Sequence, residues 1–309
     1  MRANVELLFV SVVWGINAIA VKDALTGFLP LQFNVIRLSL AAVLLLVILR
    51  AGGDLEVPSR RDWPMIVLAG FLGNTFYQYM FIKGISLSTA SNTSFVLATM
   101  PATTALLSHF LGKQRLTARM WVGVLLTVAG VAAIVVGSNG GLAGLFRSSL
   151  GRGALAGDLM TLSGTIGWCL CTIIAADLTK RMSPTAFTAW TMVAGALLLI
   201  PLSLGDLMRA DWSAATPRNW AELVLSGSIA NGLCYILWNR GVKLSGPAST
   251  AVFSNLNPVW TGVFAYLILH ETWTWQKLVG ATVVLAGVSL VRLGQGSREK
   301  RKRVPMRVN

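Results

Sequence analysis

Charged side chains are scarce in this 309-residue chain: Asp, Glu, Lys and Arg make up 12% of it, whereas 54% is apolar. Soluble domains carry roughly 25% charged residues, so this chain lacks the polar side chains that would cover a globule in water. Long apolar segments with few charges are typical of transmembrane helices. The composition therefore predicts an all-α integral membrane protein and excludes a soluble globular fold.

Cysteine and histidine are also rare, with three and two residues. Cys169, Cys171 and Cys234 fall within apolar segments, which favours small core residues over a disulfide framework or a zinc site. His109 and His270 lie near the ends of such segments. The sequence therefore predicts no metal and no cofactor.

Acidic side chains lie in loops and at or near segment ends, and Asp158 is the least peripheral of them. A carboxylate relay of the kind that many proton pumps use is therefore not expected. The chain also lacks the Gly-x-x-x-x-Gly-Lys-Ser/Thr loop that binds nucleotide phosphates, and no nucleophile–base set recurs at a useful spacing. These absences argue against an ATP-driven pump and against an enzyme.

The net charge of +14 would indicate a nucleic-acid partner in a soluble protein. Here Lys and Arg lie in short breaks between apolar segments, where they set the orientation of membrane helices. With a cytoplasmic N-terminus, the cytoplasmic breaks and tail hold 18 of them and the outer breaks hold 7. We therefore expect no nucleic acid, both termini in the cytoplasm, and a location in the bacterial inner (plasma) membrane, with the basic tail against anionic lipid.

Ten apolar segments have the length needed to cross a bilayer, about 20 residues each. They are continuous, whereas the strands of a membrane β-barrel alternate over about ten residues. The breaks between them leave no room for a soluble domain. The expected spans are about 5–22, 31–49, 64–82, 89–110, 119–137, 155–178, 184–204, 219–239, 246–269 and 275–293.

The two halves of the chain repeat one pattern. Residues 68–137 match residues 225–294 at a constant offset of 157, with 16 identities in 70 positions. The matches include Gly70 with Gly227, Asn74 with Asn231, and Pro101 with Pro258, while the first spans match at an offset of 154, as Trp14 with Trp168. The predicted organisation is one five-helix repeat at 1–138, a linker loop at 139–154, a second repeat at 155–294 and a basic tail at 295–309.

Five spans per repeat is an odd number, so the second copy would enter the membrane in the opposite orientation. The loop charges agree, because Lys83 falls outside while its counterpart Arg240 falls inside. Inverted repeats of this kind build transporters whose binding site lies near the bilayer midplane. The predicted fold is therefore ten transmembrane helices arranged as two inverted five-helix repeats.

Several residues of this pattern are similar to a known family. Ser11-Val-Val-Trp14-Gly15-Ile-Asn17 opens the first copy, Gly157-Asp158 and Trp168 open the second, and both prolines are followed by Gly123, Ala129, Gly130 and by Gly280, Ala286, Gly287. On these residues the chain resembles the EamA family of the drug/metabolite transporter superfamily over 5–293. Gln114 stands where that family often has Glu, whereas Glu271 keeps it.

The resemblance implies a fold and an activity. In that family the first, third and fourth spans of each half line a central cavity, and the fifth spans pack the halves together. Most members export amino acids, metabolites or drugs.

Buried amides supply the first candidate cavity residues. Asn74 and Gln78 share one helix face with Tyr77 beside them, and Asn231 and Tyr235 do the same, with Trp238 a turn further on. An amide in hydrocarbon is costly unless it bonds a partner or faces water. The pattern predicts a polar strip along a substrate cavity, and interhelical bonding inside the bundle stays the alternative.

Trp14 with Asn17, and Trp168 with Cys171, place an aromatic and a small group on one face of the first span of each copy. Such an aromatic can stack on an aromatic or cationic substrate, or can simply pack.

Pro101 and Pro258 fall inside spans and predict helix bends, which would free the carbonyl groups of Leu97 and Ser254. The remaining cavity candidates, Asn92, Asn255 and Asn257, are polar residues of the same two spans.

Glycines recur every seven residues in the fifth span of each copy, at Gly123, Gly130, Gly280 and Gly287 among others. Small residues let helix backbones approach closely, so these positions predict helix packing.

Arg37 is the clearest charge inside a span. It lies about two turns from the span's end, close enough to extend its side chain to the membrane interface, with Asp23 as a candidate partner. A direct role in substrate binding is the alternative.

The sequence as a whole predicts a secondary transporter, an exporter of small metabolites with amino acids favoured by the resemblance, working by alternating access. A non-transporting membrane scaffold or receptor, or a membrane-embedded enzyme, are the alternatives. Replacing Asn74 or Asn231 with leucine is expected to abolish transport while leaving membrane insertion intact.

Overall fold

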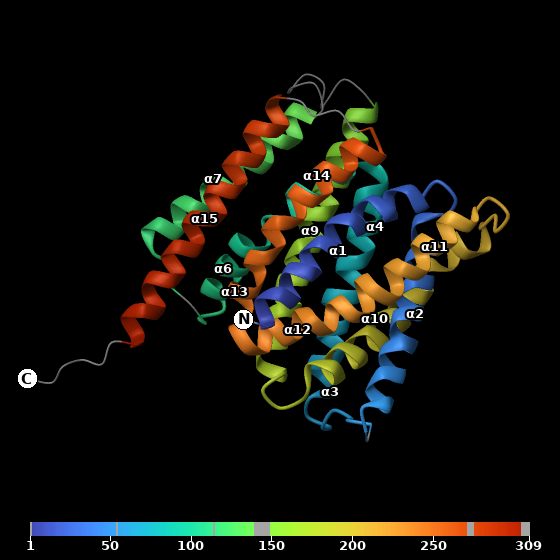
Figure 1. The fold of residues 1–309 in the computed structure, drawn as a ribbon, viewed down its shortest axis with the longest axis horizontal. Helices are drawn as coiled ribbons and strands as arrows, with labels where there is room; N and C mark the ends of the chain where they lie inside the picture. Colours follow the sequence, from blue (N-terminus) through green and yellow to red (C-terminus); the bar gives the residue numbers. More distant parts are fainter. Residues whose placement is uncertain (1, 54, 114, 139–148, 271–274, 304–309) are drawn as a thin grey trace, which may run out of the picture.

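The computed structural model describes residues 2–53, 55–113, 115–138, 149–270 and 275–303, and over these ranges it contains helices and no strand. The first half comprises α1 (Arg2–Ala24), α2 (Pro30–Ala51), α3 (Trp63–Gly70), η1 (Phe71–Phe76), α4 (Tyr77–Leu87), α5 (Ala90–Leu97), α6 (Met100–Phe110) and α7 (Ala118–Ser138). The second comprises α9 (Ser149–Leu178), α10 (Pro184–Met208), α11 (Pro217–Leu225), η2 (Ser226–Leu233), α12 (Cys234–Ser245), α13 (Pro247–Ala251), η3 (Val252–Leu256), α14 (Asn257–Ile268) and α15 (Trp275–Arg303). Figure 1 shows these helices as one bundle, with α7 and α15 along one side.

Six helical segments are long and apolar enough to cross a membrane: Asn4–Ala24, Pro30–Ala51, Trp63–Leu87, Gly153–Leu178, Pro184–Met208 and Pro217–Ser245. The other four expected spans are also helical, but α5–α6 and α13–α14 are interrupted, and the apolar stretches of α7 and α15 are shorter. The all-helical membrane character expected from the composition is confirmed.

Two boundaries differ from the expected organisation. Helix α9 begins at Ser149, so the last part of the expected 139–154 linker is helical. Helix α15 continues to Arg303, into the expected tail. Residues 139–148 and 304–309 lie outside the described residues, and so do Gln114 and Glu271.

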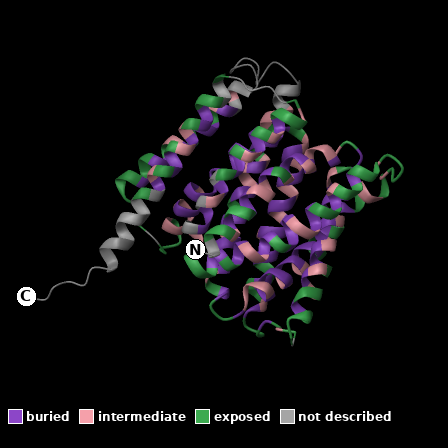
Figure 2. Ribbon diagram, viewed as in Figure 1, coloured by how far each residue is buried: buried purple, intermediate pink, exposed green. Residues whose placement is uncertain are grey.

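The outer surface carries large apolar side chains. Val43, Leu125 and Leu197, on three different helices, are between 61% and 66% exposed. Figure 2 shows buried residues gathered between the helices and exposed ones along their outer faces. An apolar exterior of this kind suits lipid better than water.

The prolines expected to bend two spans instead stand in the first turn of a new helix. Helix α5 ends at Leu97 and α6 begins at Met100, with Pro101 in its first turn, and Pro258 has the same place in α14 after the 3₁₀ segment η3. A first turn tolerates proline because its N–H groups have no partner within the helix. At these breaks Thr99 Oγ1 donates to the carbonyl of Val96 at 2.7 Å, and Ser254 Oγ to that of Ala251 at 2.6 Å.

Both third spans contain a π-helical segment, η1 and η2, at matching positions of the two copies. Each packs on the second helix of the other copy. A Cβ on Gly70, just before η1, would lie 2.7 Å from the carbonyl oxygen of Thr191, and one on Gly227 would lie 2.8 Å from that of Arg37. Because Thr191 is the counterpart of Arg37, the two contacts are reciprocal.

Helices α7 and α15 cross at their glycines. A Cβ on Gly123 would lie 2.5 Å from the carbonyl oxygen of Gly287, and one on Gly130 would lie 2.8 Å from that of Gly280. The residue numbers rise along one helix as they fall along the other, so the two helices are antiparallel. Small residues here let the backbones touch.

Candidate functional site

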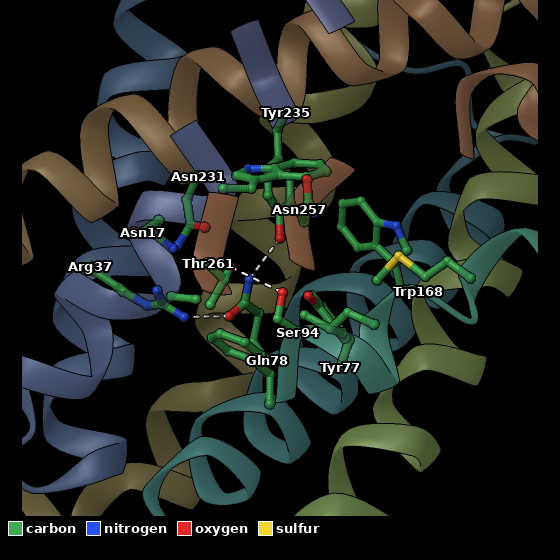
Figure 3. Close-up of a pocket in the computed structure, with 15 residues that line it drawn as sticks. Asn17, Arg37, Tyr77, Gln78, Ser94, Trp168, Asn231, Tyr235, Asn257 and Thr261 are labelled. Carbon is green, nitrogen blue, oxygen red and sulfur yellow. Dashed lines mark hydrogen bonds between the residues drawn. The ribbon is translucent and has the colours of Figure 1, made fainter. Parts of the chain in front are cut away.

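A cavity of about 50 Å³ lies inside the bundle (Figure 3). Its lining comes from both copies: Trp14, Asn17, Ala18, Arg37, Tyr77, Gln78, Phe81, Ser94, Leu97, Met100, Trp168, Asn231, Tyr235, Asn257 and Thr261.

Equivalent positions of the two copies meet in this lining. The rings of Trp14 and Trp168 are edge to face with their centroids 5.8 Å apart. Gln78 Nε2 donates to Tyr235 Oη at 2.7 Å, and these residues are separated by 157 positions, the offset of the repeat. The cavity therefore lies where equivalent positions of the two copies face one another.

Aromatic rings form one wall. Trp168 packs against Tyr77 at 5.1 Å and against Tyr235 at 5.0 Å between ring centroids. Trp14 Nε1 donates to the carbonyl of Ala230 at 3.0 Å, which fixes the plane of that indole. This wall can hold an apolar or aromatic body and can stabilise a cation.

Three buried polar atoms of the lining have no hydrogen-bond partner among the described residues. They are Asn231 Nδ2, Asn257 Oδ1 and Trp168 Nε1. Leaving a buried donor or acceptor unbonded costs about 1–3 kcal/mol, so a ligand or water that bonds them would recover this energy. The cavity thus offers both donors and an acceptor.

A chain of hydroxyl groups joins the copies across the cavity. Ser94 Oγ of α5 donates to Thr261 Oγ1 of α14 at 3.0 Å, and Thr261 Oγ1 donates to the carbonyl of Gly15 in α1 at 3.0 Å. Neither residue was predicted from the sequence, because Ser and Thr are common in membrane helices and often bond only their own helix. Ser94 matches Ala251 and gives no paired signal, whereas Thr261 matches Thr104, an identity between the copies that could have marked it.

Arg37 is buried inside the bundle, whereas its sequence position predicted a side chain that extends to the membrane interface. It is 1% exposed, and its guanidinium donates to Asn34 Oδ1 from Nε at 2.9 Å, to Ser226 Oγ from Nη1 at 2.9 Å, and to Gln78 Oε1 from Nη2 at 2.7 Å. Asp23, its candidate partner, pairs instead with Arg218 at 2.9 Å. Neutral amide and hydroxyl oxygens accept hydrogen bonds from the guanidinium, so its charge is stabilised without contact with water.

Eight predicted residues line the cavity, namely Trp14, Asn17, Tyr77, Gln78, Trp168, Asn231, Tyr235 and Asn257. Three others do not. Asn74 lies against α10, where a Cβ on Gly195 would come 2.3 Å from the Cβ of Asn74. Trp238 stands behind Trp14, with ring centroids 5.1 Å apart. Asn92 donates to Asp158 Oδ2 at 3.4 Å. The side chain of Asn255 lies outside the described residues.

Asp158 is more deeply buried than its sequence position suggested. It is 2% exposed and accepts a hydrogen bond from Ser88 Oγ at 2.5 Å. It does not line the cavity, and its hydrogen bonds link α9 to the α4–α5 turn and to α5. Among the residues described, no three His, Cys, Asp or Glu side chains gather in a way that could hold a metal ion.

A model of the EamA-like transporter family matches this chain twice, over residues 2–136 and 155–293. Curated relatives include the uncharacterized transporter YyaM of Bacillus subtilis, 25% identical, which aligns over 93% of this chain and 92% of its own length. The chain is also similar to a protein of Streptantibioticus cattleyicolor named a probable terminal-alkyne amino-acid exporter, 27% identical over 99% of this chain and 98% of its own length. A solved crystal structure, 16% identical, has the same fold with a TM-score of 0.70 over 95% of this chain and 99% of its own.

Proposed function

The chain belongs to the EamA-like transporter family, and from this premise we propose that it is a secondary transporter that moves a small metabolite by alternating access. The single observation that carries the mechanism is the position of the cavity, where Trp14 meets Trp168 and Gln78 meets Tyr235. A site on the pseudo-symmetry axis can be exposed to one side or the other when the two copies rock.

We also propose that the ten helical segments are ten spans and that the copies are inverted. What supports the inversion is the antiparallel crossing of α7 and α15, since these helices occupy equivalent positions in the two copies. The reciprocal contacts of Gly70 and Gly227 support it further. With both termini cytoplasmic, the excess of Lys and Arg falls on the cytoplasmic side.

The small cavity indicates an occluded state. Ligand pockets usually enclose about 300–1,000 Å³, and 50 Å³ is far less. Binding of a metabolite then requires the aromatic wall or the two halves to move apart. Such a movement is the opening step that alternating access demands.

The substrate in this proposal is a small metabolite, and an amino acid fits the lining. Amide groups of Asn231 and Asn257 can bond its polar end, and the aromatic wall can cover its side chain. The amino-acid exporter name of one relative points the same way, and towards export. The test is metabolite release from cells that do and do not express the protein, followed by flux of the released compound in proteoliposomes. Absence of any difference in release, together with unimpaired folding, would favour a scaffold or receptor.

Replacing Asn74 and replacing Asn231 with leucine should have different effects, although the sequence predicted loss of transport for both. Asn231→Leu removes an unpaired amide from the cavity, so flux should fall at least about tenfold, the equivalent of 1.4 kcal/mol, at unchanged thermal stability. Asn74 packs against α10 and does not line the cavity, and leucine is bulkier than asparagine, so Asn74→Leu should lower the melting temperature first. Flux in proteoliposomes and scanning fluorimetry on both variants separate the two effects. Normal flux in Asn231→Leu would remove that residue from the binding site.

A further inference from the structure

We propose that Arg37 binds a carboxylate group of the cargo, so that the transported compound is a monocarboxylate with an apolar or aromatic body. This inference rests on the proposed transport function and adds the chemical class of its substrate. Its starting point is a buried cation that lines the cavity.

The guanidinium of Arg37 lacks an acidic partner among the described residues. Its three hydrogen-bond acceptors are an asparagine, a serine and a glutamine. Other cations of the bundle do have carboxylate partners, as Lys83 with Asp206 and Arg240 with Glu6. A buried charge that meets only neutral dipoles is costly in a membrane, and such residues usually face a substrate or ion path.

Arg37 also has unused donors. A guanidinium carries five N–H groups in a planar fork, and the three hydrogen bonds leave one N–H on Nη1 and one on Nη2. The rings of Phe33 and Phe81 lie 5.3 Å and 5.7 Å from Cζ. A carboxylate oxygen can accept a hydrogen bond from a remaining donor of the guanidinium. The rings cover the cation without neutralising it.

The lining carries one positive charge, which favours a ligand with one negative charge. Of the fifteen residues that line the cavity, Arg37 alone carries a formal charge. One carboxylate compensates the charge of Arg37, and the ammonium group of an amino acid would be stabilised by the aromatic wall, whereas a phosphate dianion or a dicarboxylate would leave an uncompensated negative charge in a low-dielectric site. Trp168 lies on the other side of the cavity from Arg37 (Figure 3), and its ring, with that of Trp14 against it, can cover the body of the compound.

The test measures binding to the purified full-length protein in detergent by tryptophan fluorescence and by thermal shift. The probes are isobutyrate and 3-phenylpropionate, the neutral amides of both, and phenyl phosphate as a dianion. We expect a carboxylate to bind at least about tenfold more tightly than its amide, since hydrogen bonds to charged groups contribute about 1.5–3 kcal/mol. Phenyl phosphate should bind more weakly than 3-phenylpropionate.

Two variants assign the preference to Arg37. Arg37→Gln should remove it, so that a carboxylate and its amide bind with equal affinity. Gln78→Glu keeps the guanidinium and places a carboxylate where the amide oxygen already accepts from Nη2. It should therefore also abolish the preference. Because Arg37 is retained, this variant does not remove a buried charge from the fold. Arg218→Gln is the matched control, because Arg218 is 64% exposed and lies outside the cavity; it should keep the preference.

Equal binding of carboxylate and amide by the unmodified protein overturns the inference, and so does the absence of carboxylate binding up to about 10 mM. A preference that survives in both Arg37→Gln and Gln78→Glu overturns it as well. Carboxylate binding without flux in proteoliposomes would refute transport but keep the site. Flux of amines or neutral compounds without any preference for carboxylates would support transport but refute a carboxylate site at Arg37.

Discussion

A Ser94→Cys, Thr261→Cys double variant is expected to lose transport completely upon oxidation and to regain it upon reduction. The two hydroxyl oxygens are 3.0 Å apart, and a disulfide bond joins sulfur atoms at about 2.05 Å, so a small shift closes the bond. Ser94 belongs to α5 of the first copy and Thr261 to α14 of the second. The bond would therefore join the two halves beside the cavity.

The physical reason is the small volume of the cavity. A cavity of about 50 Å³ can admit a metabolite only if the surrounding helices separate, and the new bond would hold two of them together. Flux in proteoliposomes is measured before oxidation, after oxidation with copper phenanthroline, and after dithiothreitol. The single variants Ser94→Cys and Thr261→Cys, treated in the same way, control for oxidation of the buried cysteines Cys169, Cys171 and Cys234.

Cross-linked protein that still transports at the reduced rate would show that α5 and α14 do not separate during the cycle. The proposed rocking of one copy against the other would then be wrong. If the thiols form no bond at all, mass spectrometry of the oxidised protein would reveal it directly, and the hydroxyl pair would have to lie further apart in the membrane than in the described structure.

Much of the fold could be predicted from apolar length and from repeated residues. Glycines and prolines that match between copies mark helix contacts and helix starts, because these residue types act through the backbone. Pro101 and Pro258 illustrate the limit, since the sequence located the interruption but described it as a bend within one helix. The π-helical segments η1 and η2 were not foreseen, because a π turn depends on packing against another helix and has no periodic signal of its own.

The site could be predicted only where equivalent side chains of both copies line the cavity. The pair Trp14 and Trp168 was found in this way. Arg37 was misplaced because its acceptors, Ser226 and Gln78, are distant in the sequence and neutral. Ser94 and Thr261 were missed for a similar reason, since only the folded chain brings their hydroxyl groups together.

Asn74 and Asn231 match in sequence but not in place, and Gly195 supplies a physical reason. The absence of a side chain at Gly195 leaves room for Asn74 against α10, whereas the matching position in α2 is Ala41, which carries a Cβ. Asn231 lines the cavity instead. A repeated residue can therefore pack against a helix in one copy and line the cavity in the other.

The second large effect follows from this contact: Gly195→Ala should strongly destabilise the protein. The new Cβ would lie 2.3 Å from the Cβ of Asn74 and 2.7 Å from the carbonyl oxygen of Gly70, and neither neighbour can yield without moving η1 or the end of α3. Overpacking of this kind costs about 1–3 kcal/mol or more. Scanning fluorimetry and size-exclusion chromatography should show a lower melting temperature and less monodisperse protein.

Gly205→Ala is the matched control, because it makes the same change in the same helix where a Cβ would meet nothing within 4 Å. It should be neutral or slightly stabilising, since alanine is favoured over glycine in a helix by up to about 1 kcal/mol. Adding Asn74→Gly to Gly195→Ala removes the nearer of the two contacts and should restore part of the stability, with a coupling that a double-mutant cycle can measure. Equal stability of Gly195→Ala and Gly205→Ala would mean that α10 and η1 are not packed as described. The assignment of Asn74 to packing against α10 would then be wrong as well, and its side chain could extend to the cavity.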